Sequence, residues 1–312
     1  MSTSTDVWSL SDMPDQAGRT TVVTGCTTGG LGYFTALELA RRGGRVVLAG
    51  RSTAKLGDAA TAIRRQVPAA ELLQMEVDLA DLGSVRKAAA HAHSIGPIDV
   101  LVNNAGVMAP PYERTVDGLE IQMATNHFGP FLFTGLLLPQ LVASQAARVV
   151  TVSSPMHRVA RKPPLGDPFT RKGRYAAWQV YGQTKLANLL FTYELDRRCR
   201  DAELPVKALA AHPGSSGTHL MTNRGSSRAR AAASTILDAA FQAFSQSAHM
   251  GALPTLMAAT EDLPGGTYCG PSGLSEVRGL PVVVGSTKLS RDESVQRAMW
   301  ELSEKTVGLD YP

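Results

Sequence analysis

Short apolar runs alternate with longer amphipathic segments along most of the chain from Thr20 onward. This alternation is typical of βαβ units whose strands form a parallel sheet. The runs predict strands at about 20–24, 45–49, 72–77, 99–103, 148–152, 206–211 and 267–270, and the longer segments predict helices near 31–42, 53–66, 82–94, 117–138, 176–201 and 229–259. Runs 46–49 and 149–152 are apolar on both faces, as strands between two helical layers are. We therefore expect an α/β fold: a single Rossmann-type doubly wound parallel sheet of about seven strands with helices on both faces.

The same pattern divides the chain into an N-terminal extension, residues 1–18, and a single domain, residues 19–312. Two stretches interrupt the compact rhythm: 155–174 is rich in Pro, Arg, Lys and Gly, and 215–230 is rich in Ser, Gly and Arg. Each follows the carboxyl end of a predicted strand, the edge at which open α/β sheets bind ligands. We therefore predict substrate loops at about 155–180 and 215–250. Trp178 and Phe169 are candidate apolar surfaces there, and core packing is an equally good interpretation of both.

Charge, hydropathy and cysteine usage exclude several classes of protein. The net charge is +4, but the basic residues are scattered and form no stripe, so we expect no nucleic-acid partner. The longest apolar stretch, 128–138, is shorter than the roughly 20 residues that span a bilayer, and the first eighteen residues hold no apolar run, so we expect no membrane insertion. Cys26, Cys199 and Cys269 lie far apart without metal-ligand spacing. They predict reduced thiols in a cytoplasmic protein with no metal site.

Glycines follow the first predicted strand. Residues 20–24 run into Gly25-Cys26-Thr27-Thr28-Gly29-Gly30-Leu31-Gly32 and then into a helical segment. Glycines let a backbone approach a pyrophosphate, and the helix N-terminus offers it unpaired N–H groups and positive partial charge. A plain tight turn also needs glycine, so the position after the first strand is what favours a dinucleotide site.

Tyr181 and Lys185 stand at positions i and i+4 of a predicted helix and therefore share one of its faces. A free tyrosine has a pKa of about 10 and must lose roughly three units to act as a base near neutrality. One cation at about 4 Å in an effective dielectric near 20 supplies about that much, roughly 4 kcal/mol. The pair therefore predicts a proton-transfer site, and an exposed helix face is the plain alternative.

Two further strand ends carry polar residues. Asn103-Asn104-Ala105-Gly106 follows the strand near 99–103, where a turn that hydrogen-bonds its own backbone is the favoured use of the asparagines and the glycine leaves room for a cofactor. Ser153-Ser154 follows the next strand, where a hydroxyl could bind a substrate oxygen or simply form a turn.

The end of the second strand indicates which nucleotide is preferred. Gly50-Arg51 stands nineteen positions past Gly32, with no acidic residue before Asp58. In this fold an acidic residue there bonds the ribose 2′-hydroxyl of NAD, whereas an arginine accommodates a 2′-phosphate. Arg51 therefore predicts NADP(H), with an arginine merely lying along a strand end as the alternative.

Taken in this order, these motifs resemble the short-chain dehydrogenase/reductase family over about residues 18–285. The resemblance is closest to its retinol-dehydrogenase-like and protochlorophyllide-reductase-like branch, on Arg-Val-Val-Leu-Ala-Gly-Arg (45–51), Tyr-Gly-Gln-Thr-Lys-Leu-Ala-Asn (181–188) and His-Pro-Gly (212–214) with Thr218. One feature departs from the family pattern: the glycine loop is one residue longer than TGxxxGxG, and either Gly29 or Gly30 is the extra residue.

The resemblance implies a role for each matching residue. Tyr181 would exchange the proton with the substrate oxygen, Lys185 would lower its pKa and hold the nicotinamide ribose, and Ser154 would orient the carbonyl. Asn126 would position a water leading to Lys185, although a mid-helix asparagine is more often solvated or capping. The implied cofactor-binding set is Gly25, Thr28, Gly30, Leu31, Gly32, Arg51, Asp78, Leu79, Asn104, Ala105, Gly106, Tyr181, Lys185, Pro213, Gly214 and Thr218.

The expected activity is hydride transfer between NADP(H) and a small-molecule carbonyl or a primary or secondary alcohol, with Tyr181 as general acid/base. An NADP-sensing regulatory protein on the same fold is the first alternative, although such proteins can lack the tyrosine and lysine. An epimerase or dehydratase is the second, although its TGxxGxxG motif does not fit residues 25–32. The sequence is compatible with a homo-oligomer and does not specify the substrate.

Overall fold

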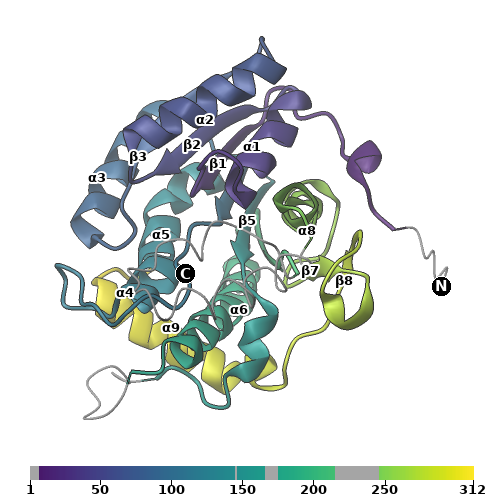
Figure 1. The fold of residues 1–312 in the computed structure, drawn as a ribbon. Helices are drawn as coiled ribbons and strands as arrows, with labels where there is room; N and C mark the ends of the chain where they lie inside the picture. The colour runs from purple at the N-terminus through teal and green to yellow at the C-terminus, as the bar shows by residue number, and fades with distance from the viewer. Residues whose placement is uncertain (1–6, 145, 166–174, 215–245) are drawn as a thin grey trace, which may run out of the picture.

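The computed structural model describes residues 7–144, 146–165, 175–214 and 246–312. Their strands form one sheet of eight in the order β3-β2-β1-β4-β5-β6-β7-β8 (Figure 1). The strands are β1 Thr20–Thr24, β2 Arg45–Gly50, β3 Leu72–Glu76, β4 Val100–Asn103, β5 Ala147–Val152, β6 Val206–Ala211, β7 Tyr268–Pro271 and β8 Pro281–Val283. All neighbours pair in parallel except β7 and β8, which are antiparallel. The predicted doubly wound sheet is therefore confirmed, with eight strands where about seven were expected.

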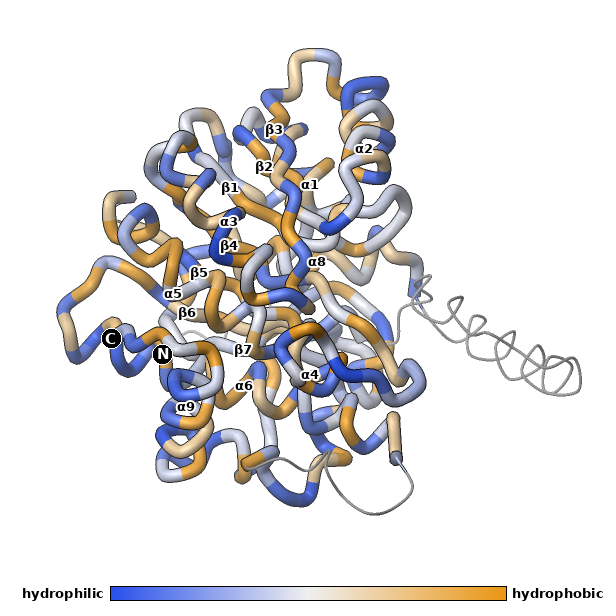
Figure 2. Tube along the Cα trace, turned by 90° about the vertical axis from the view of Figure 1, so that its left-hand side faces the viewer, coloured by the Kyte–Doolittle hydropathy of each residue, from blue (hydrophilic) through white to orange (hydrophobic). Residues whose placement is uncertain are grey.

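Helices cover both faces of this sheet. They are α1 Leu31–Arg41, α2 Thr53–Gln66, α3 Leu82–Ala92, α5 Gly129–Val142, α6 Ala177–Asp201, α8 Ala248–Thr260 and α9 Glu293–Val307. One apolar core joins α1, α2 and α8 to the sheet, and a second joins α3, α5, α6 and α9 to its other face. Polar residues lie on the outer turns of α2, as the blue segments of Figure 2 show. Among the described helices, none is long and apolar enough to cross a membrane.

The helix expected at 117–138 starts later than predicted and is not regular. Gly118 has φ +73° and closes a turn by donating its N–H to the Thr115 carbonyl, 2.9 Å away. The first helical residues form α4, Ile121–Met123, and Ala124–Phe128 then form a π-helical turn that leads into α5. The helix expected at 229–259 is described only from α8 onward, because residues 215–245 lie outside the described part of the chain.

Two elements near the C-terminus were not expected from the sequence. β8 has only three residues and is half exposed, so it shows neither the length nor the burial of the central strands. α9 begins at an Asp292 cap and buries Met299 and Trp300 against α6. Near the other end, Trp8 and Met13 are buried in the core beside α1, so the described part of the N-terminal extension packs on the sheet's helical layer.

The topology fixes where a ligand would bind. The chain order along the sheet reverses between β1 and β4, and a ligand in a doubly wound fold binds at the carboxyl ends of the strands beside such a reversal. The glycine loop, the Asn103–Gly106 turn and the Ser153-Ser154 pair follow β1, β4 and β5, which are neighbours in the sheet. All three therefore meet at one edge.

Candidate active site

The glycine loop contains a tight turn just before α1. The Gly30 N–H donates to the Thr27 carbonyl at 2.9 Å, and Gly29, the third residue of this turn, has φ +78°. A side chain at Gly29 would meet open space, so its backbone conformation is what requires glycine. Gly30 then caps α1, and Leu31 is its first helical residue. The turn at 27–30 therefore includes both Gly29 and Gly30, and α1 starts directly after it.

Two other glycines of the loop let it pack tightly on the turn after β4. A Cβ at Gly25 would lie 2.9 Å from the Ala105 Cα, and one at Gly32 would lie 2.6 Å from Asn104 Nδ2. Asn104 Nδ2 donates to the Thr24 carbonyl at 2.7 Å, and the Thr24 hydroxyl accepts the N–H groups of Asn104 and Ala105, both at 3.0 Å. The Asn104 side chain therefore has a structural role, but it ties the turn after β4 to the end of β1 and does not bond its own turn as expected.

Tyr181 and Lys185 are both buried on one face of α6, with 8% and 5% of their surfaces exposed. Lys185 Nζ donates to the Val152 carbonyl at 3.0 Å and lies 5.6 Å from the centre of the Tyr181 ring. Asn188 Nδ2 donates to the same carbonyl at 3.1 Å. The exposed helix face that was the alternative interpretation is therefore not what the structure shows: the pair faces the end of β5.

The pKa of Tyr181 moves in the direction opposite to the one expected from the sequence. Burial raises the pKa of Tyr181 to about 12, and a hydrogen bond with the Ser154 side chain opposes part of that rise. Burial lowers the pKa of Lys185 to about 8. The ammonium lies beside the ring and bonds a carbonyl, so in the free protein desolvation outweighs its attraction for the phenolate.

Asn126 is 1% exposed and occupies the π-helical turn, a distortion that is frequent at functional sites. Its Oδ1 accepts the Val107 N–H at 2.7 Å, and its Nδ2 donates to the Val107 carbonyl at 2.9 Å and to the Thr184 hydroxyl at 3.0 Å. A Cβ at Gly106 would lie 3.0 Å from Asn126 Oδ1 and 3.7 Å from Lys185 Nζ. Asn126 therefore joins the turn after β4 to α6 and is not a solvated helix residue.

The remaining predicted cofactor residues lie around the same edge. Arg51 is exposed directly after β2 and makes no hydrogen bond or ion pair with another described residue. Asp78 Oδ1 accepts the Ala80 N–H at 2.9 Å, and Leu79 is buried against α5, where a Cβ at Gly129 would meet its carbonyl. Pro213 and Gly214 follow β6, Thr28 is exposed in the glycine loop, and Thr218 and Phe169 lie outside the described residues.

A polar network at the entrance to α6 was missed in the sequence. Gln122 is fully buried; its Oε1 accepts the Ala109 N–H at 3.0 Å, and its Nε2 donates to Tyr175 Oη at 2.6 Å and to the Ala177 carbonyl at 3.0 Å. Tyr175 in turn donates to buried Glu120 at 2.5 Å, and burial raises the pKa of that carboxyl. The signal was present: Glu120 and Gln122 alternate with the apolar residues Leu119, Ile121 and Met123.

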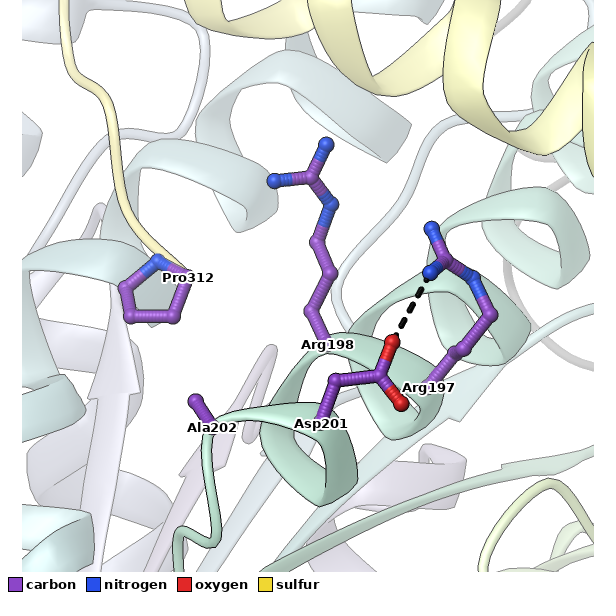
Figure 3. A pocket seen from close by; sticks show the side chains of 5 residues that line it. All are labelled: Arg197, Arg198, Asp201, Ala202 and Pro312. Atoms are coloured by element: carbon purple, nitrogen blue, oxygen red, sulfur yellow. Dashed lines mark hydrogen bonds and ion pairs between the residues drawn. The ribbon is translucent and has the colours of Figure 1, made fainter.

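A separate pocket of about 390 Å³ lies at the far end of α6 (Figure 3). Arg197, Arg198, Asp201, Ala202 and Pro312 line it, and an ion pair of 3.0 Å joins Arg197 to Asp201. Asp201 is twenty residues beyond Tyr181 on the same helix, a distance of roughly 30 Å at 1.5 Å per residue. This pocket is therefore not part of the candidate active site.

Comparisons with known proteins agree with this fold. The family model of the short chain dehydrogenases matches residues 19–165. Human retinol dehydrogenase 13 is 38% identical over 299 residues, which cover 95% of this chain and 86% of that protein. Human retinol dehydrogenase 14 is 35% identical over 309 residues, with coverage of 94% and 87%. The crystal structure of an uncharacterized protein from Mycobacterium paratuberculosis matches with a TM-score of 0.78 and 41% identity, over 98% of this chain and 100% of that one.

The chain belongs to the short-chain dehydrogenase/reductase family and is an oxidoreductase. Within the family it falls in the retinol-dehydrogenase-like branch. This family binds nicotinamide cofactors and acts on small-molecule substrates.

Proposed function

We propose that the protein is an NADP(H)-dependent oxidoreductase that interconverts a carbonyl and an alcohol, with Tyr181 as the general acid/base. The observation that carries this proposal is the convergence of Tyr181, Lys185 and Ser154, buried or half-buried, at the end of β5. The neighbouring strand β4 ends in the turn against which the glycine loop packs. Asn126 contributes by holding the turn after β4 against α6. The cytoplasmic location is part of the proposal and is supported by three buried cysteines that are all free thiols.

The residues at the sheet edge fit a dinucleotide. At Gly25 and Gly32 there is no room for a Cβ, so the loop backbone can lie against the turn after β4 and leave α1 open toward a pyrophosphate. Arg51, exposed and without a partner among the described residues, would bind the 2′-phosphate. The turn at Pro213 and Gly214 would lie on the nicotinamide side, and Lys185 would hold the ribose.

The chemistry divides between the cofactor and the protein. When bound, the nicotinamide supplies a hydride from C4 to the carbonyl carbon, or accepts one in the reverse direction. Because the pKa of Tyr181 is raised to about 12, its phenol is protonated at neutral pH and can donate a proton to the carbonyl oxygen during reduction. Ser154 Oγ accepts the Met156 N–H at 3.2 Å and shares a hydrogen bond with Tyr181, so its hydroxyl would turn from Tyr181 to the carbonyl oxygen when substrate binds. Lys185 would stabilise the phenolate that Tyr181 becomes when it has donated its proton.

The direct test is a panel of aldehydes and ketones with NADPH, followed by loss of nicotinamide absorbance. We expect turnover of at least one carbonyl, with NADH a poorer donor. A folded protein that binds NADPH and reduces none of a broad panel would contradict the proposed activity.

Replacement of Lys185 should change both the rate and its dependence on pH. Because the pKa of Lys185 is lowered to about 8, its ammonium is lost as the pH rises through that value, and we expect carbonyl reduction by the unmodified protein to slow above about pH 8. Lys185→Met should lower kcat/KM about 100-fold, weaken NADPH binding and lack that alkaline decline. The control is Lys207→Met, which removes a surface ion pair with Asp262. Unchanged NADPH affinity in Lys185→Met would show that Lys185 does not bind the nicotinamide ribose.

The first turn of α6 should form one wall of the substrate cleft. Trp178 is 41% exposed, and its ring makes an edge contact with Tyr181 at 6.2 Å between centres. We expect Trp178→Ala to reorder kcat/KM among carbonyls of different apolar size by about tenfold while NADPH affinity stays within twofold. Val283→Ala, at an exposed apolar position on β8, is the control. An unchanged ranking with a lower melting temperature would give Trp178 a structural role only.

A further inference from the structure

A buried histidine directly follows β6, just before the turn that the proposed function assigns to the nicotinamide side. His212 follows β6 directly, is fully buried, and packs against the Tyr268 ring at 5.1 Å between centres. Its Nδ1 accepts the Gly214 N–H at 3.2 Å, so the ring proton resides on Nε2. Nε2 then donates to Glu276 Oε2 at 3.0 Å. Burial lowers the pKa of His212, so this contact is a hydrogen bond from a neutral ring to a carboxylate and not an ion pair.

The same carboxylate reaches the turn that follows Ser154. Arg158 Nη2 donates to Glu276 Oε1 at 2.7 Å. Arg158 lies in the short 3-10 helix Pro155–Val159, whose cap is Ser154. His157, in the same helix, interacts through Nδ1 with the Ser154 carbonyl at 2.7 Å. Glu276 therefore connects the strand end that carries Pro213 and Gly214 to the helix that positions the Ser154 hydroxyl.

The surrounding backbone is shaped to present this carboxylate. Ser275 and Glu276 have φ values of +54° and +56°, a left-handed conformation that non-glycine residues rarely adopt and that persists only where the surroundings hold it. A Cβ at Gly270 would lie 2.1 Å from His212 Nε2, so only glycine leaves room for the imidazole there. A Cβ at Gly214 would lie 2.4 Å from the Val277 carbonyl, which shows how closely the β7–β8 connection packs on the turn after β6.

A second polar residue strengthens the same junction. Gln246 is 8% exposed; its Nε2 donates to the Pro213 carbonyl at 2.7 Å, and its Oε1 accepts the Gly279 N–H at 3.2 Å. The turn at 212–214 is thus bonded to the β7–β8 connection from both sides. Neither contact uses a residue of the proposed proton-transfer set.

We propose that His212, Glu276 and Arg158 form a positioning clamp that fixes the turn at Pro213 and Gly214 relative to Ser154. The inference rests on the proposed function, because it assigns the turn to the nicotinamide side of the site. His212, Glu276 and Arg158 touch neither substrate nor cofactor; they act through the turn after β6 and through the helix that begins after Ser154. Loss of the clamp should therefore weaken nicotinamide nucleotide binding and lower kcat together, without removing the acid/base.

The test measures the dissociation constant of NADPH by its fluorescence on binding the full chain, alongside kcat and the melting temperature. Glu276→Gln keeps the shape but replaces a charge-assisted bond, and we expect NADPH to bind about tenfold more weakly. Glu293→Gln, which alters a surface carboxylate paired with Arg297 at 3.6 Å, should stay within twofold. His212→Asn can still accept the Gly214 N–H but is too short to reach Glu276, so it should resemble Glu276→Gln, and the double variant should be no worse than either.

Two outcomes separate the clamp from the proposed function. If the unmodified protein does not bind NADPH, the proposed function and the clamp fall together. If it does bind, and Glu276→Gln and His212→Asn leave the dissociation constant and kcat within twofold, or lower only the melting temperature, the clamp alone is overturned. If a buried variant does not fold, Arg158→Met decides the question, because the Arg158 side chain is 39% exposed. We expect Arg158→Met to lower kcat by a larger factor than it weakens NADPH binding. An unchanged kcat would overturn the clamp.

Discussion

Tyr181→Phe is expected to lower kcat by about 100-fold to 10,000-fold, the usual contribution of general acid–base catalysis, with NADPH affinity nearly unchanged. The substitution removes one oxygen from a side chain that is 8% exposed, so the ring still fills its place on α6 while the transferable proton is lost. Burial keeps that proton on the phenol at neutral pH by raising the pKa of Tyr181 to about 12. Kinetics with the best carbonyl of the panel, together with NADPH titration, measure both quantities.

Tyr193→Phe provides a matched control for this prediction. It is the same substitution on the same helix, at a buried tyrosine whose hydroxyl donates to Ser286 at 2.9 Å. We expect it to retain kcat within about threefold. If Tyr181→Phe keeps more than a few per cent of kcat while Tyr193→Phe behaves as expected, another group is the acid.

The second large effect is expected in nucleotide preference. Arg51 can give paired N–H donors to a 2′-phosphate, a charge-assisted contact worth roughly 1.5–3 kcal/mol, or about tenfold to a hundredfold in affinity. Gly50→Asp/Arg51→Ala removes that contact and places a carboxylate where a ribose 2′-hydroxyl would donate to it. We expect the ratio of kcat/KM for NADPH to that for NADH to fall on the order of 100-fold to 1,000-fold. Measuring kcat/KM with both nucleotides gives the ratio directly.

Lys55→Ala controls for loss of a neighbouring cation, because Lys55 is an exposed residue one turn into α2 from Arg51. The Lys55→Ala variant should have the same ratio of kcat/KM for NADPH to that for NADH as the unmodified protein. Equal use of NADH and NADPH before any substitution would contradict the assignment of Arg51, and so would a double variant whose ratio does not move.

Much of the fold was predictable because buried parallel strands must be apolar on both faces. Runs such as 46–49 and 149–152 predict central strands without knowledge of their partners, and the structure places both within β2 and β5. β8 was not predictable on the same ground, because its three residues are half exposed and pair only with β7. The start of the helix at 117–138 was predicted too early because Gly118 closes a turn that the apolar pattern does not reveal.

The candidate site was predictable where a few residues of one helix or one turn carry the signal. Tyr181 and Lys185 share a face because of their spacing. Asn104 has a structural role, as its residue type indicates, but its side chain bonds the Thr24 carbonyl of β1 and not its own turn. The sequence argument predicted that the pKa of Tyr181 would fall, and this was wrong. The shift depends on how deeply the ring is buried, which the spacing of two residues does not show. The contacts of Glu276 with Arg158 and His212 span 118 and 64 residues, so no local pattern could indicate them.

A deuterium label shows whether a hydride passes from the nicotinamide to the carbonyl carbon. The best carbonyl of the panel is reduced with NADPH that carries deuterium at both positions of C4, and the alcohol is analysed by mass spectrometry. Direct hydride transfer predicts an alcohol with a single deuterium on the former carbonyl carbon, formed by the unmodified protein and at most in trace amounts by Tyr181→Phe. An alcohol without deuterium, or deuterated product formed by Tyr181→Phe at the unmodified rate, would contradict hydride transfer assisted by Tyr181.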